Sequence, residues 1–445
     1  MHSMAHQRSI HQAHNYLVVG LGLTGFATAR YLIGRGYPCV LQDDRAQPPY
    51  LESLRRMYPD TNVMLQALDK QMIEHFDCWV VSPGVSIRSP MIQQAIEQGV
   101  RIIGDIELYA EAVEVPVIAI TGSNGKSTVT TLVGEMARFD GKQVALGGNI
   151  GTPVLDLLDQ DHELHVLELS SFQLESTSSL QPVAATVLNV SEDHMDRYRD
   201  LADYCATKHR IYHGAQSCIS NADDASTRHG DDDVQFSVLR EDCAFHLAKQ
   251  STSSQLMVHG ETWIDAREVR LKGRHNLANS LAATALALEA GISRTAILKA
   301  LRDFAGLPHR SQWVAEVNGV TWINDSKATN PGAAQAAIEG LGHPVILLAG
   351  GQGKGANMQS LCETVRKHLR CMLVFGEDAA VIESSLAGCC AIELMNTLDE
   401  AVVRAYRIAQ PGDVVLLSPA CASFDQYTGF EQRGEHFMQL VGQLQ

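Results

Sequence analysis

The sequence has no excess of positive charge, no long apolar run and no cysteine pair with C-x-x-C spacing. Its 445 residues include 35 Lys and Arg against 51 Asp and Glu, which gives a formal net charge of −16 at pH 7. A chain this acidic is a poor candidate for wrapping nucleic acid or an anionic membrane surface, although a local positive site could still bind a phosphorylated small molecule. No apolar run approaches the roughly 18 residues of a membrane-spanning helix. We therefore expect neither a nucleic-acid partner nor a membrane partner.

The cysteines and the N-terminus both point to a cytoplasmic protein. The 10 cysteines contain no C-x-x-C spacing, so we expect free, mostly buried thiols in a reduced compartment. Residues 1–15 carry four histidines but no apolar segment, which argues against a signal peptide. Those histidines could bind a metal, but a disordered, solvated tail is the interpretation that we favour.

Length and pattern predict three α/β domains. At about 150 residues per domain, a chain of 445 residues corresponds to roughly three domains. Short apolar, β-branched runs alternate with helical patterns, which is typical of mostly parallel sheets covered on both faces. Seams near Gly104 and Gly306 separate the domains, and residues 313–317 and 320–323 flank an Asn-Gly turn that predicts a hairpin. The predicted domains are residues 1–104, 105–306 and 307–445.

The first glycine motif follows a predicted strand and opens a helix. Residues 20–25 read GLGLTG, a G-x-G-x-x-G fingerprint, and Asp43 and Asp44 end the next strand. The pattern predicts a Rossmann-like first domain in which a helix N-terminus binds a pyrophosphate. Three interpretations stay open: a dinucleotide, another diphosphate such as a UDP-linked one, or a tight turn without a ligand. A second glycine turn at residues 82–84 would lie at the same edge of the sheet.

A phosphate-binding loop begins the central domain. The apolar run 117–120 leads into residues 121–128, which read TGSNGKST, and a helical stretch follows. In such a loop successive backbone N–H groups form an anion nest, a lysine such as Lys126 reaches the β- and γ-phosphates, and a hydroxyl such as that of Ser127 can ligate Mg²⁺. The general motif has glycine where Ile120 stands, so the loop indicates a branch distinct from GTPases and motor ATPases. We predict a central P-loop ATPase-type domain with a parallel sheet.

An acidic residue and a histidine follow neighbouring strands of this domain. Glu168 ends one predicted strand, and His194 comes shortly after another. Because the carboxyl ends of neighbouring strands converge on the ligand in an open sheet, both residues could ligate a metal beside Lys126. An isolated histidine would normally be a hydrogen-bonded loop residue, so this prediction depends on the shared edge.

Taken together, these motifs resemble those of the muramyl and folylpolyglutamyl amide ligases. The resemblance runs from about Leu17 to Gln445, and its most specific blocks are DSKATN at 325–330 and SPACASF at 418–424. Other matching blocks are LELSSFQ at 167–173, NVSEDHMD at 189–196, GRHN at 273–276 and LPHR at 307–310. The set is most similar to the muramyl ligases that add D-glutamate to UDP-N-acetylmuramoyl-L-alanine.

The resemblance implies a fold and a reaction. It implies a Rossmann-like N-terminal domain that binds UDP, a central ATPase domain, and a Rossmann-like C-terminal domain that receives the amino acid. ATP with Mg²⁺, at two sites, would activate the substrate carboxylate as an acyl phosphate, which the amine of D-glutamate would attack. Such an ADP-forming ligase, expected as a monomer, would serve cytoplasmic peptidoglycan synthesis, and through it cell wall biogenesis, cell shape and cell division.

The resemblance also implies roles for individual residues. The expected catalytic residues are Lys126, Glu168, His194 and Lys208. The expected metal ligands are Ser127, Glu168, His194 and Lys208, the last as a carbamate. The expected ATP contacts are Gly122, Ser123, Asn124, Gly125, Lys126, Ser127, Thr128, Asn276, Asn279, Arg310 and Asp325. The expected UDP-substrate contacts are Leu23, Thr24, Asp43, Asp44, Arg45, Ser82, Pro83, Gly84, Asn149 and His194. The expected D-glutamate contacts are Lys327, Thr329, Lys354, Ser423, Phe424 and Phe430.

Two positions depart from the family pattern. The segment between His194 and Lys208 is about one residue shorter than the pattern, and a plain surface lysine is the alternative for Lys208. Gln352 stands where an acidic residue is expected, which puts that contact in doubt but not the contact of Lys354.

Other functions remain as alternatives. A sister ligase would add L-alanine, a diamino acid, or glutamate to folate. A nicotinamide-dependent oxidoreductase could be built on residues 20–25, but it would leave the phosphate loop unexplained. A non-catalytic ATP-driven switch would use the phosphate loop without a carboxylate substrate.

Overall fold

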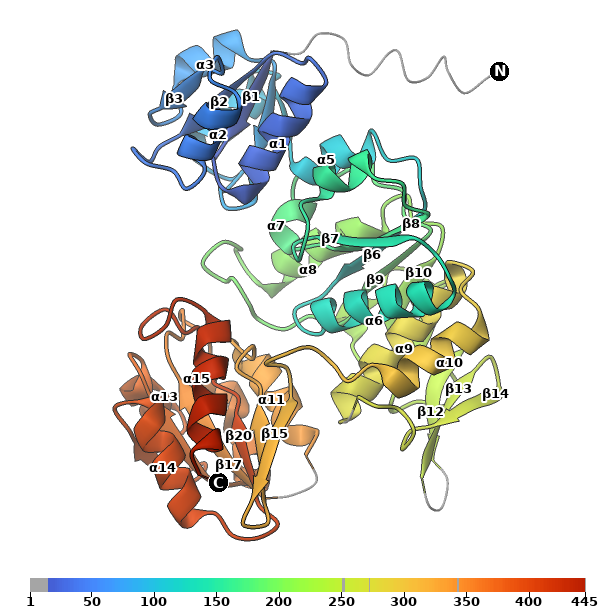
Figure 1. Cartoon of the computed structure of the whole chain (residues 1–445), viewed down its shortest axis with the longest axis vertical. Coiled ribbons are helices and arrows are strands. Elements are labelled where there is room, and N and C mark those ends of the chain that lie inside the picture. The colour runs from blue at the N-terminus through green and yellow to red at the C-terminus, as the bar shows by residue number, and fades with distance from the viewer. Residues whose placement is uncertain (1–14, 250–252, 272, 342–343, 445) are drawn as a thin grey trace.

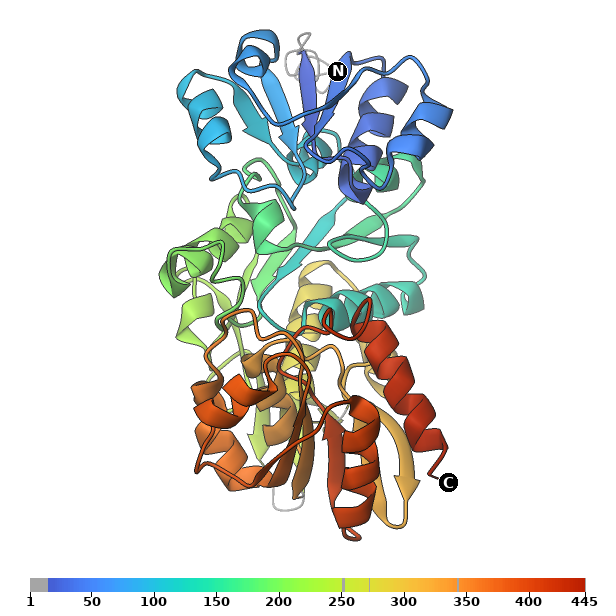
Figure 2. The same ribbon diagram turned by 90° about the vertical axis from the view of Figure 1, so that its left-hand side faces the viewer.

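Three α/β domains are stacked along the long axis of the molecule, with the central domain between the other two (Figures 1 and 2). A computed structural model describes residues 15–249, 253–271, 273–341 and 344–444. The histidine-rich tail for which we predict disorder lies outside these described residues, apart from Asn15. Each domain is built on its own sheet, so the predicted three-domain α/β architecture is confirmed.

The first domain is a parallel five-stranded sheet in the order β3-β2-β1-β4-β5. Its elements are β1 (Tyr16–Val19), α1 (Leu23–Gly34), β2 (Cys39–Asp43), α2 (Leu51–Met57), β3 (Val63–Leu65), α3 (Lys70–His75), β4 (Cys78–Val81), α4 (Pro90–Glu97) and β5 (Arg101–Ile103). Every residue of β1 and β4 is buried, as expected for central strands with helices on both faces. The strand order reverses between β1 and β4, and ligands bind outside the carboxyl ends of strands at such a point.

The central domain holds a nine-stranded sheet in the order β14-β13-β12-β11-β10-β9-β6-β8-β7. Its strands are β6 (Val117–Thr121), β7 (Val144–Gly148), β8 (Leu164–Glu168), β9 (Ala184–Val187), β10 (Cys218–Asn221), β11 (Val234–Ser237), β12 (Phe245–Lys249), β13 (Ser254–Val258) and β14 (Glu261–Asp265). Its helices are α5 (Asp105–Ala110), α6 (Lys126–Phe139), η1 (Val154–Asp159), α7 (Ser171–Leu174), α8 (Leu201–His209), η2 (Arg210–Tyr212), η3 (Ala225–Thr227), α9 (Arg274–Glu289) and α10 (Arg294–Asp303).

The prediction of a parallel central sheet is wrong at one edge. The strands β12, β13 and β14 pair antiparallel. A two-residue turn joins β13 to β14, and its residues His259 and Gly260 have φ of 48° and 81°. Positive φ at both turn residues is the geometry of a tight hairpin, so no crossover helix is needed there and the sheet is mixed.

The third domain is a six-stranded sheet in the order β15-β16-β20-β17-β18-β19. Its strands are β15 (Gln312–Val317), β16 (Val320–Asn324), β17 (Val345–Gly350), β18 (Leu369–Phe375), β19 (Ile392–Leu394) and β20 (Val414–Leu417). Its helices are α11 (Pro331–Glu339), η4 (Met358–Leu361), α12 (Cys362–His368), α13 (Ala379–Ser385), α14 (Leu398–Ile408) and α15 (Phe430–Gly442). The predicted hairpin is confirmed, because β15 and β16 pair antiparallel across Asn318 and Gly319.

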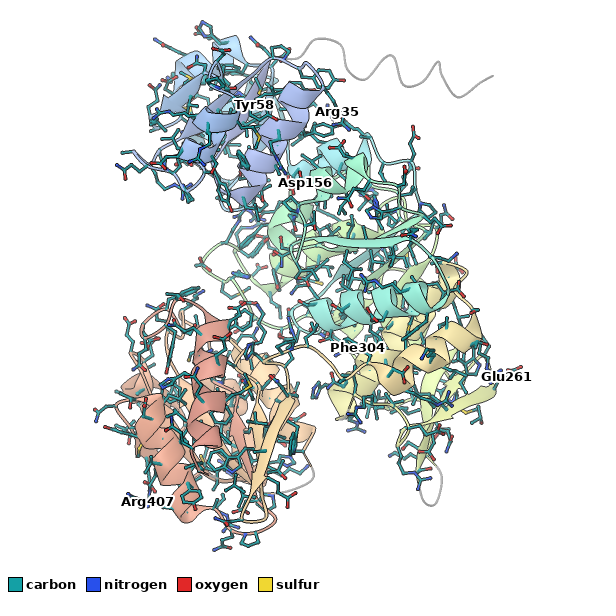
Figure 3. All side chains as sticks on the ribbon, in the orientation of Figure 1. Arg35, Tyr58, Asp156, Glu261, Phe304 and Arg407 are labelled. Carbon is teal, nitrogen blue, oxygen red and sulfur yellow. A yellow bond between two sulfur atoms is a disulfide. The ribbon has the colours of Figure 1, made fainter. Side chains whose placement is uncertain are left out.

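Apolar packing joins the first domain to the central one, whereas the third domain has apolar clusters of its own. One buried cluster contains Tyr16 and Val18 of β1 together with Ile106 of α5 and Leu155 of η1. At the same boundary Arg30 of α1 pairs with Asp156 of η1, which is labelled in Figure 3. Among the described residues, the two apolar clusters of the third domain contain no residue that precedes Val314. The third domain therefore carries its own core, and the chain enters it shortly after Phe304, also labelled in Figure 3.

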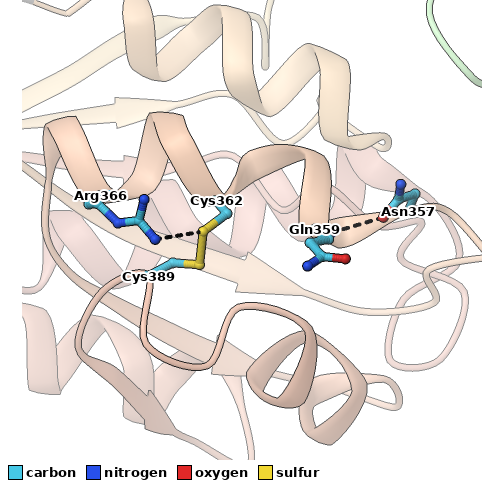
Figure 4. The surroundings of a disulfide bond; sticks show 5 residues. All are labelled: Asn357, Gln359, Cys362, Arg366 and Cys389. Atoms are coloured by element: carbon cyan, nitrogen blue, oxygen red, sulfur yellow. Dashed lines mark hydrogen bonds between the residues drawn. A yellow bond between two sulfur atoms is a disulfide. The ribbon is translucent and has the colours of Figure 1, made fainter.

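The expectation that every cysteine is a free thiol is wrong for one pair. Cys362 and Cys389 form a disulfide with their Cα atoms 5.3 Å apart (Figure 4). Cys362 begins α12 and Cys389 follows α13, so packing of the two helical segments brings together residues that are 27 positions apart. Such a pair has no signature in local spacing, and the cysteines no longer support a reduced compartment. None of the described helices is long and apolar enough to cross a membrane.

Candidate active site

The glycine turn after β1 is held by its own backbone and by one carboxylate. Gly20 has a φ of 89°, and a Cβ on Gly25 would lie 1.8 Å from the Gly20 carbonyl oxygen, so no other residue fits there. The Leu21 N–H donates to Asp43 Oδ2 at 2.7 Å, and the Arg45 guanidinium donates to both Asp43 oxygens. Burial opposes ionisation, but these hydrogen bonds outweigh it and lower the pKa of Asp43 to about 2. Asp43 therefore shapes the turn and is not a free carboxylate for a ribose.

The remaining first-domain candidates surround the carboxyl edge of β1 and β4. The Ser82 hydroxyl donates to the Gly20 carbonyl at 3.0 Å and ties the two glycine turns together. Asp44, Arg45 and Gly84 are exposed at this edge, as is Leu23 at the start of α1. The other two, Thr24 and Pro83, are partly buried in the same turns. The sequence-predicted UDP residues of this domain thus lie together at the switch point of the sheet.

The phosphate loop places two lysines on one carbonyl group. Gly122 and Gly125 have φ of 154° and 85°, which lets the chain turn sharply between β6 and α6. Lys126 Nζ donates to the Gly122 and Ser123 carbonyls at 2.8 and 3.0 Å. Lys208 Nζ, from α8, donates to the same Gly122 carbonyl at 2.9 Å. The loop is therefore surrounded by positive charge before any phosphate is bound.

Burial makes both ammonium groups costly to keep charged. Desolvation lowers the pKa of Lys126, and Glu168 and Asp193 oppose that shift. For Lys208, which is 1% exposed, burial and then the charge of Lys126 hold the pKa well below its usual range. A bound anion would offset both costs.

Glu168 lies beside this loop, and one of its carboxylate oxygens has no hydrogen-bond partner in the described part of the chain. Its carboxylate is 2% exposed, and Oε1 accepts a hydrogen bond from Asn149 Nδ2 at 2.7 Å. Oε2 is buried and has no hydrogen-bond partner among the described residues, and the same holds for the Thr121 hydroxyl at the end of β6. A buried carboxylate oxygen without a donor is expensive, and a cation would satisfy it.

His194 adopts a left-handed backbone conformation that is uncommon for residues other than glycine. Its φ is 58°, and its ring lies 4.7 Å from the Phe172 ring. Burial is the main reason that the pKa of His194 is lowered, although Asp193 and Asp196 oppose the shift. The imidazole is therefore kept neutral, which is the form that ligates a metal.

A cavity of about 580 Å³ runs from the phosphate loop into the gap between the central and third domains. The Asn279 and Asn276 amides of α9 are hydrogen-bonded to each other at 3.3 Å, and both residues line the cavity. The sequence-predicted ATP residues that line it are Asn124, Gly125, Thr128, Asn276, Asn279, Arg310 and Asp325. Its size falls within the range of small-ligand sites.

The third domain reaches the phosphate loop directly. Arg310 Nη2 donates to the Ser127 hydroxyl at 2.8 Å, and Asn330 Nδ2 approaches Asn124 Oδ1 at 3.4 Å. Asp325 accepts hydrogen bonds from the Ser311 N–H and, at 2.8 Å, from the Ser418 hydroxyl. Burial raises the pKa of Asp325 to about 6 in spite of these hydrogen bonds. Asp325 thus positions the Arg310 segment.

Two further lysines of the third domain each lie over an aromatic ring. Lys327 Nζ is 3.8 Å from the centre of the Phe430 ring, and Lys354 Nζ is 5.5 Å from the centre of the Phe424 ring. Burial, followed by the charge of Arg310, lowers the pKa of Lys327 to about 8. Thr329 and Ser423, also predicted here, are partly buried and buried respectively.

The departure at Gln352 has a local explanation. Gln352 exchanges two backbone hydrogen bonds with Ala422, and its side-chain amide donates to Glu377 Oε2 at 2.9 Å. An acidic side chain is therefore present beside this loop, supplied by Glu377 from a different segment.

Sequence reasoning missed Arg433, which is fully buried at 0% exposure. Its guanidinium donates to the Ser326 hydroxyl and to the carbonyls of Ser326, Gly350 and Cys421 at 2.8 to 3.3 Å. It thereby joins the three loops that carry Lys327, Lys354 and Ser423. A lone arginine in an amphipathic helix gives no sequence signal of this kind.

Comparisons with known proteins agree with this geometry. The chain matches the MurD-like N-terminal domain of Mur ligases over residues 14–104, the Mur ligase middle domain over 120–287, and the Mur ligase glutamate ligase domain over 309–421. Among solved structures, a pseudomurein peptide ligase type C from Methanothermus fervidus superposes with a TM-score of 0.62 at 15% identity, covering 97% of this chain and 100% of that one. UDP-N-acetylmuramate-alanine ligase from Thermotoga maritima gives a TM-score of 0.59 at 18% identity, and the match covers 97% of this chain and 100% of that one. The fold and the matched domains define the class as Mur ligases, which are ATP-dependent amide ligases.

The curated relatives narrow this class. UDP-N-acetylmuramoylalanine–D-glutamate ligase from Pseudomonas putida is 48% identical over 437 residues, which cover 96% of this chain and 97% of the relative. The enzyme of the same name from Nitrosococcus oceani is 47% identical over 441 residues and 96% of each chain. The chain belongs to the family of UDP-N-acetylmuramoylalanine–D-glutamate ligases.

Replacing Gly125 by alanine tests the phosphate loop. The alanine Cβ would lie 2.5 Å from Asn279 Oδ1, at a φ of 85° that disfavours a side chain. We expect ATP binding, measured by calorimetry, to weaken at least tenfold, or by about 1.4 kcal/mol, since the clash must displace either the loop or Asn279 from the lining of the cavity. Gly141→Ala is the matched control, because Gly141 has a φ of 82° but open space around its Cβ. Equal ATP affinity in wild type and Gly125→Ala would contradict the assignment of this loop.

Proposed function

We propose that this protein joins the amine of D-glutamate to the carboxylate of UDP-N-acetylmuramoyl-L-alanine, converting ATP to ADP and phosphate, as a step of peptidoglycan synthesis. The observation that carries the proposal is the meeting of the phosphate loop with the third domain, where Arg310 contacts Ser127 beside the cavity. Relatives named for this ligation match 96% of the chain at 48% identity, which supports the choice of D-glutamate.

The chemistry explains why three domains are needed. A carboxylate is a poor electrophile, because its leaving group would be oxide. Its oxygen therefore attacks the γ-phosphorus of ATP, and ADP leaves. The amine of D-glutamate then attacks the acyl carbon, the carbon–oxygen bond to phosphate breaks, and phosphate leaves while the amine loses a proton. We assign one substrate to each domain: the UDP-linked acid to the first, ATP to the central one and the amino acid to the third.

Positive charge from two domains would hold the phosphates. The Lys126 ammonium is already fixed by two loop carbonyls, and the N-terminus of α6 adds its free N–H groups. Arg310 brings a second cation from the third domain. Because charge accumulates between two anions as the phosphoryl group moves, prepositioned cations beside the cavity would lower the barrier.

The residues present also fit a magnesium ion. The unpartnered Glu168 Oε2 and Thr121 hydroxyl are suitable oxygen donors. Among the described residues, no three His, Cys, Asp or Glu side chains are grouped so that they could hold a metal ion. Mg²⁺ usually takes only one or two carboxylate ligands and completes its coordination with phosphates and water. When bound, the ion would neutralise phosphate charge. We assign Ser127 and Glu168 to one ion and His194 to a second. The Ser127 hydroxyl, which accepts a hydrogen bond from Arg310, would then bind the first ion instead.

We further propose that Lys208 is carbamylated. Its amine is buried and hydrogen-bonded to the Gly122 carbonyl, and burial together with the charge of Lys126 holds its pKa well below the usual range. A lowered pKa makes the amine easier to deprotonate; the deprotonated amine can add CO₂ with loss of a proton, and the resulting carbamate would supply oxygen ligands for the second ion. The carbamate would also relieve the repulsion between Lys208 and Lys126.

The D-glutamate pocket would use Lys327 and Lys354. D-glutamate carries two carboxylates, and two lysines on separate loops can meet one each. The Thr329 and Ser423 hydroxyls would complete the donors, while Phe424 and Phe430 hold the two ammonium groups in place.

The UDP-linked substrate would extend from the first domain into the central one. Its uridine diphosphate would lie against the turns at residues 20–25 and 82–84, and its acyl end would reach Asn149 and His194. We keep residues 1–104, 105–306 and 307–445 as the domain boundaries, a monomer as the active form, and the cytoplasm as its place of action, where ATP is supplied.

An omission assay tests the reaction. Phosphate release should require UDP-N-acetylmuramoyl-L-alanine, ATP and D-glutamate together, and it should cease when any one of them is left out. L-alanine and diamino acids, offered in place of D-glutamate, serve as controls for the sister ligases. Absence of ADP release with D-glutamate, or a preference for another amino acid, would contradict the proposed function.

The pKa of Lys327, about 8, predicts a pH dependence. Below this pH the lysine is charged and attracts D-glutamate; above it the charge is lost, whereas an arginine stays charged. We therefore expect the ratio of kcat/KM for D-glutamate in wild type to that in Lys327→Arg to fall as the pH rises through 8. The ratio removes the titration of the substrate amine, which affects both enzymes alike. A ratio independent of pH between 7 and 9 would argue against Lys327 as a D-glutamate ligand.

Chemical rescue tests the carbamate. Lys208→Ala should lose most activity, and a small carboxylate such as formate should restore part of it by replacing the carbamate oxygens. Lys126→Ala should also be inactive, but formate should not rescue it, because a cation is missing there. Failure of several small carboxylates to rescue Lys208→Ala, together with a free amine at Lys208 by mass spectrometry, would overturn the assignment.

A further inference from the structure

Arg197 lies between the UDP turn of the first domain and the His194 segment of the central domain. Its side chain is 9% exposed. Nη1 donates to the Pro83 carbonyl at 2.8 Å, and Nη2 approaches the Val85 carbonyl at 3.4 Å. Both carbonyls belong to the turn that follows β4. One guanidinium thus bonds to the backbone of a different domain at two points.

The same arginine is fixed from the central domain. Its backbone N–H donates to the His194 carbonyl at 2.9 Å, and its guanidinium lies 4.0 Å from the centre of the Phe172 ring. The Phe172 ring in turn packs on the His194 ring. Glu175, 3% exposed at its side chain, accepts a hydrogen bond from Arg197 Nη2. The guanidinium therefore has a defined position relative to the His194 ring.

A second arginine extends this network to α8. Arg88 of the first domain donates through Nε to the other oxygen of Glu175 at 3.2 Å, and through both Nη atoms to Asp203. Asp203 lies on α8, the helix that also carries Lys208. Arg88, Arg197, Glu175 and Asp203 thus form a network across the domain boundary, and the exposed Arg199 also pairs with Asp203 at 3.5 Å.

The hydrogen bond from Arg197 to the Pro83 carbonyl also fixes the direction of the Gly84 N–H. The described peptide bonds are all trans, so the N–H of Gly84 points to the side opposite the Pro83 carbonyl. With Arg197 bonded to that carbonyl, the Gly84 N–H is turned away from Arg197. A donor on the carbonyl also polarises the peptide and strengthens its N–H as a donor to an anion. Gly84 is exposed at the edge where the proposed function places the UDP diphosphate.

We propose that Arg197 is a positioning residue for the ligation: it orients the turn at residues 82–85 so that the UDP-linked substrate places its carboxylate at the ATP site. This inference rests on the proposed function. Arg197 is not needed to hold the domains together, because the apolar cluster that contains Tyr16 and Ile106 already joins them. It acts on the substrate through the backbone of the turn and the Phe172–His194 contact.

Kinetics of Arg197→Met test the proposal. We expect KM and the calorimetric Kd for UDP-N-acetylmuramoyl-L-alanine to rise about tenfold, the effect of losing one charge-assisted hydrogen bond. KM values for ATP and D-glutamate should stay within about twofold of wild type. Arg228→Met is the matched control, since Arg228 is an arginine of the same domain whose side chain is 56% exposed and pairs with the exposed Asp231; it should leave all three KM values unchanged.

Rescue separates positioning from a merely structural role. Ethylguanidinium should lower the KM of Arg197→Ala for the UDP-linked substrate and leave its other KM values unaltered. If Arg197 variants do not fold, Glu175→Gln removes the partner of the guanidinium at constant volume and should raise the same KM. A Kd equal to that of wild type, or an equal rise in all three KM values, would overturn the proposal. Should wild type bind the UDP-linked substrate but fail to use D-glutamate, the proposed function falls, while the Kd comparison still decides the role of Arg197.

Discussion

The site depends on buried positive charge that gathers around the phosphate loop, where Glu168, Asp193 and Asp325 offset the cost of burial only in part. Lys126 and Lys208 share the Gly122 carbonyl, and Arg310 contacts Ser127 from another domain. Burial lowers the pKa of all three groups. An anion entering the cavity would relieve a desolvation cost that folding has already imposed. The formal charge of −16 makes this local arrangement necessary, because every proposed substrate is an anion approaching an acidic surface.

The two domain boundaries differ in the kind of contact that joins them. The first two domains share an apolar cluster, so the UDP turns keep a fixed distance from the phosphate loop. The third domain meets the loop through polar contacts such as that between Asn330 and Asn124. Polar contacts exchange readily with water and ligands, whereas an apolar cluster does not. Closure of the third domain over ATP can therefore be governed by the phosphates that its Arg310 would contact.

Much of the fold could be predicted because local sequence encodes it. The turn at residues 20–25, the phosphate loop and the Asn318-Gly319 hairpin each follow from residues adjacent in sequence. The disulfide of Cys362 and the contacts of Arg197 depend on segments that only tertiary packing brings together, and no local pattern announces them. The antiparallel edge of the central sheet was missed because His259-Gly260 is a rare version of a tight hairpin turn. The resemblance supplied the candidate site residues, and the structure supplied their partners.

Arg433 illustrates how a buried cation can hold several loops together without a carboxylate as its hydrogen-bond partner. This guanidinium is fully buried, and its hydrogen-bond acceptors are one hydroxyl and the carbonyls of Ser326, Gly350 and Cys421. Burial lowers its pKa to about 10, so it stays charged at neutral pH. A carboxylate partner would have formed a stronger hydrogen bond, but would also have neutralised the charge of Arg433. With neutral acceptors, Arg433 holds the three loops in place and keeps its positive charge beside the segments that carry Lys327, Lys354 and Ser423.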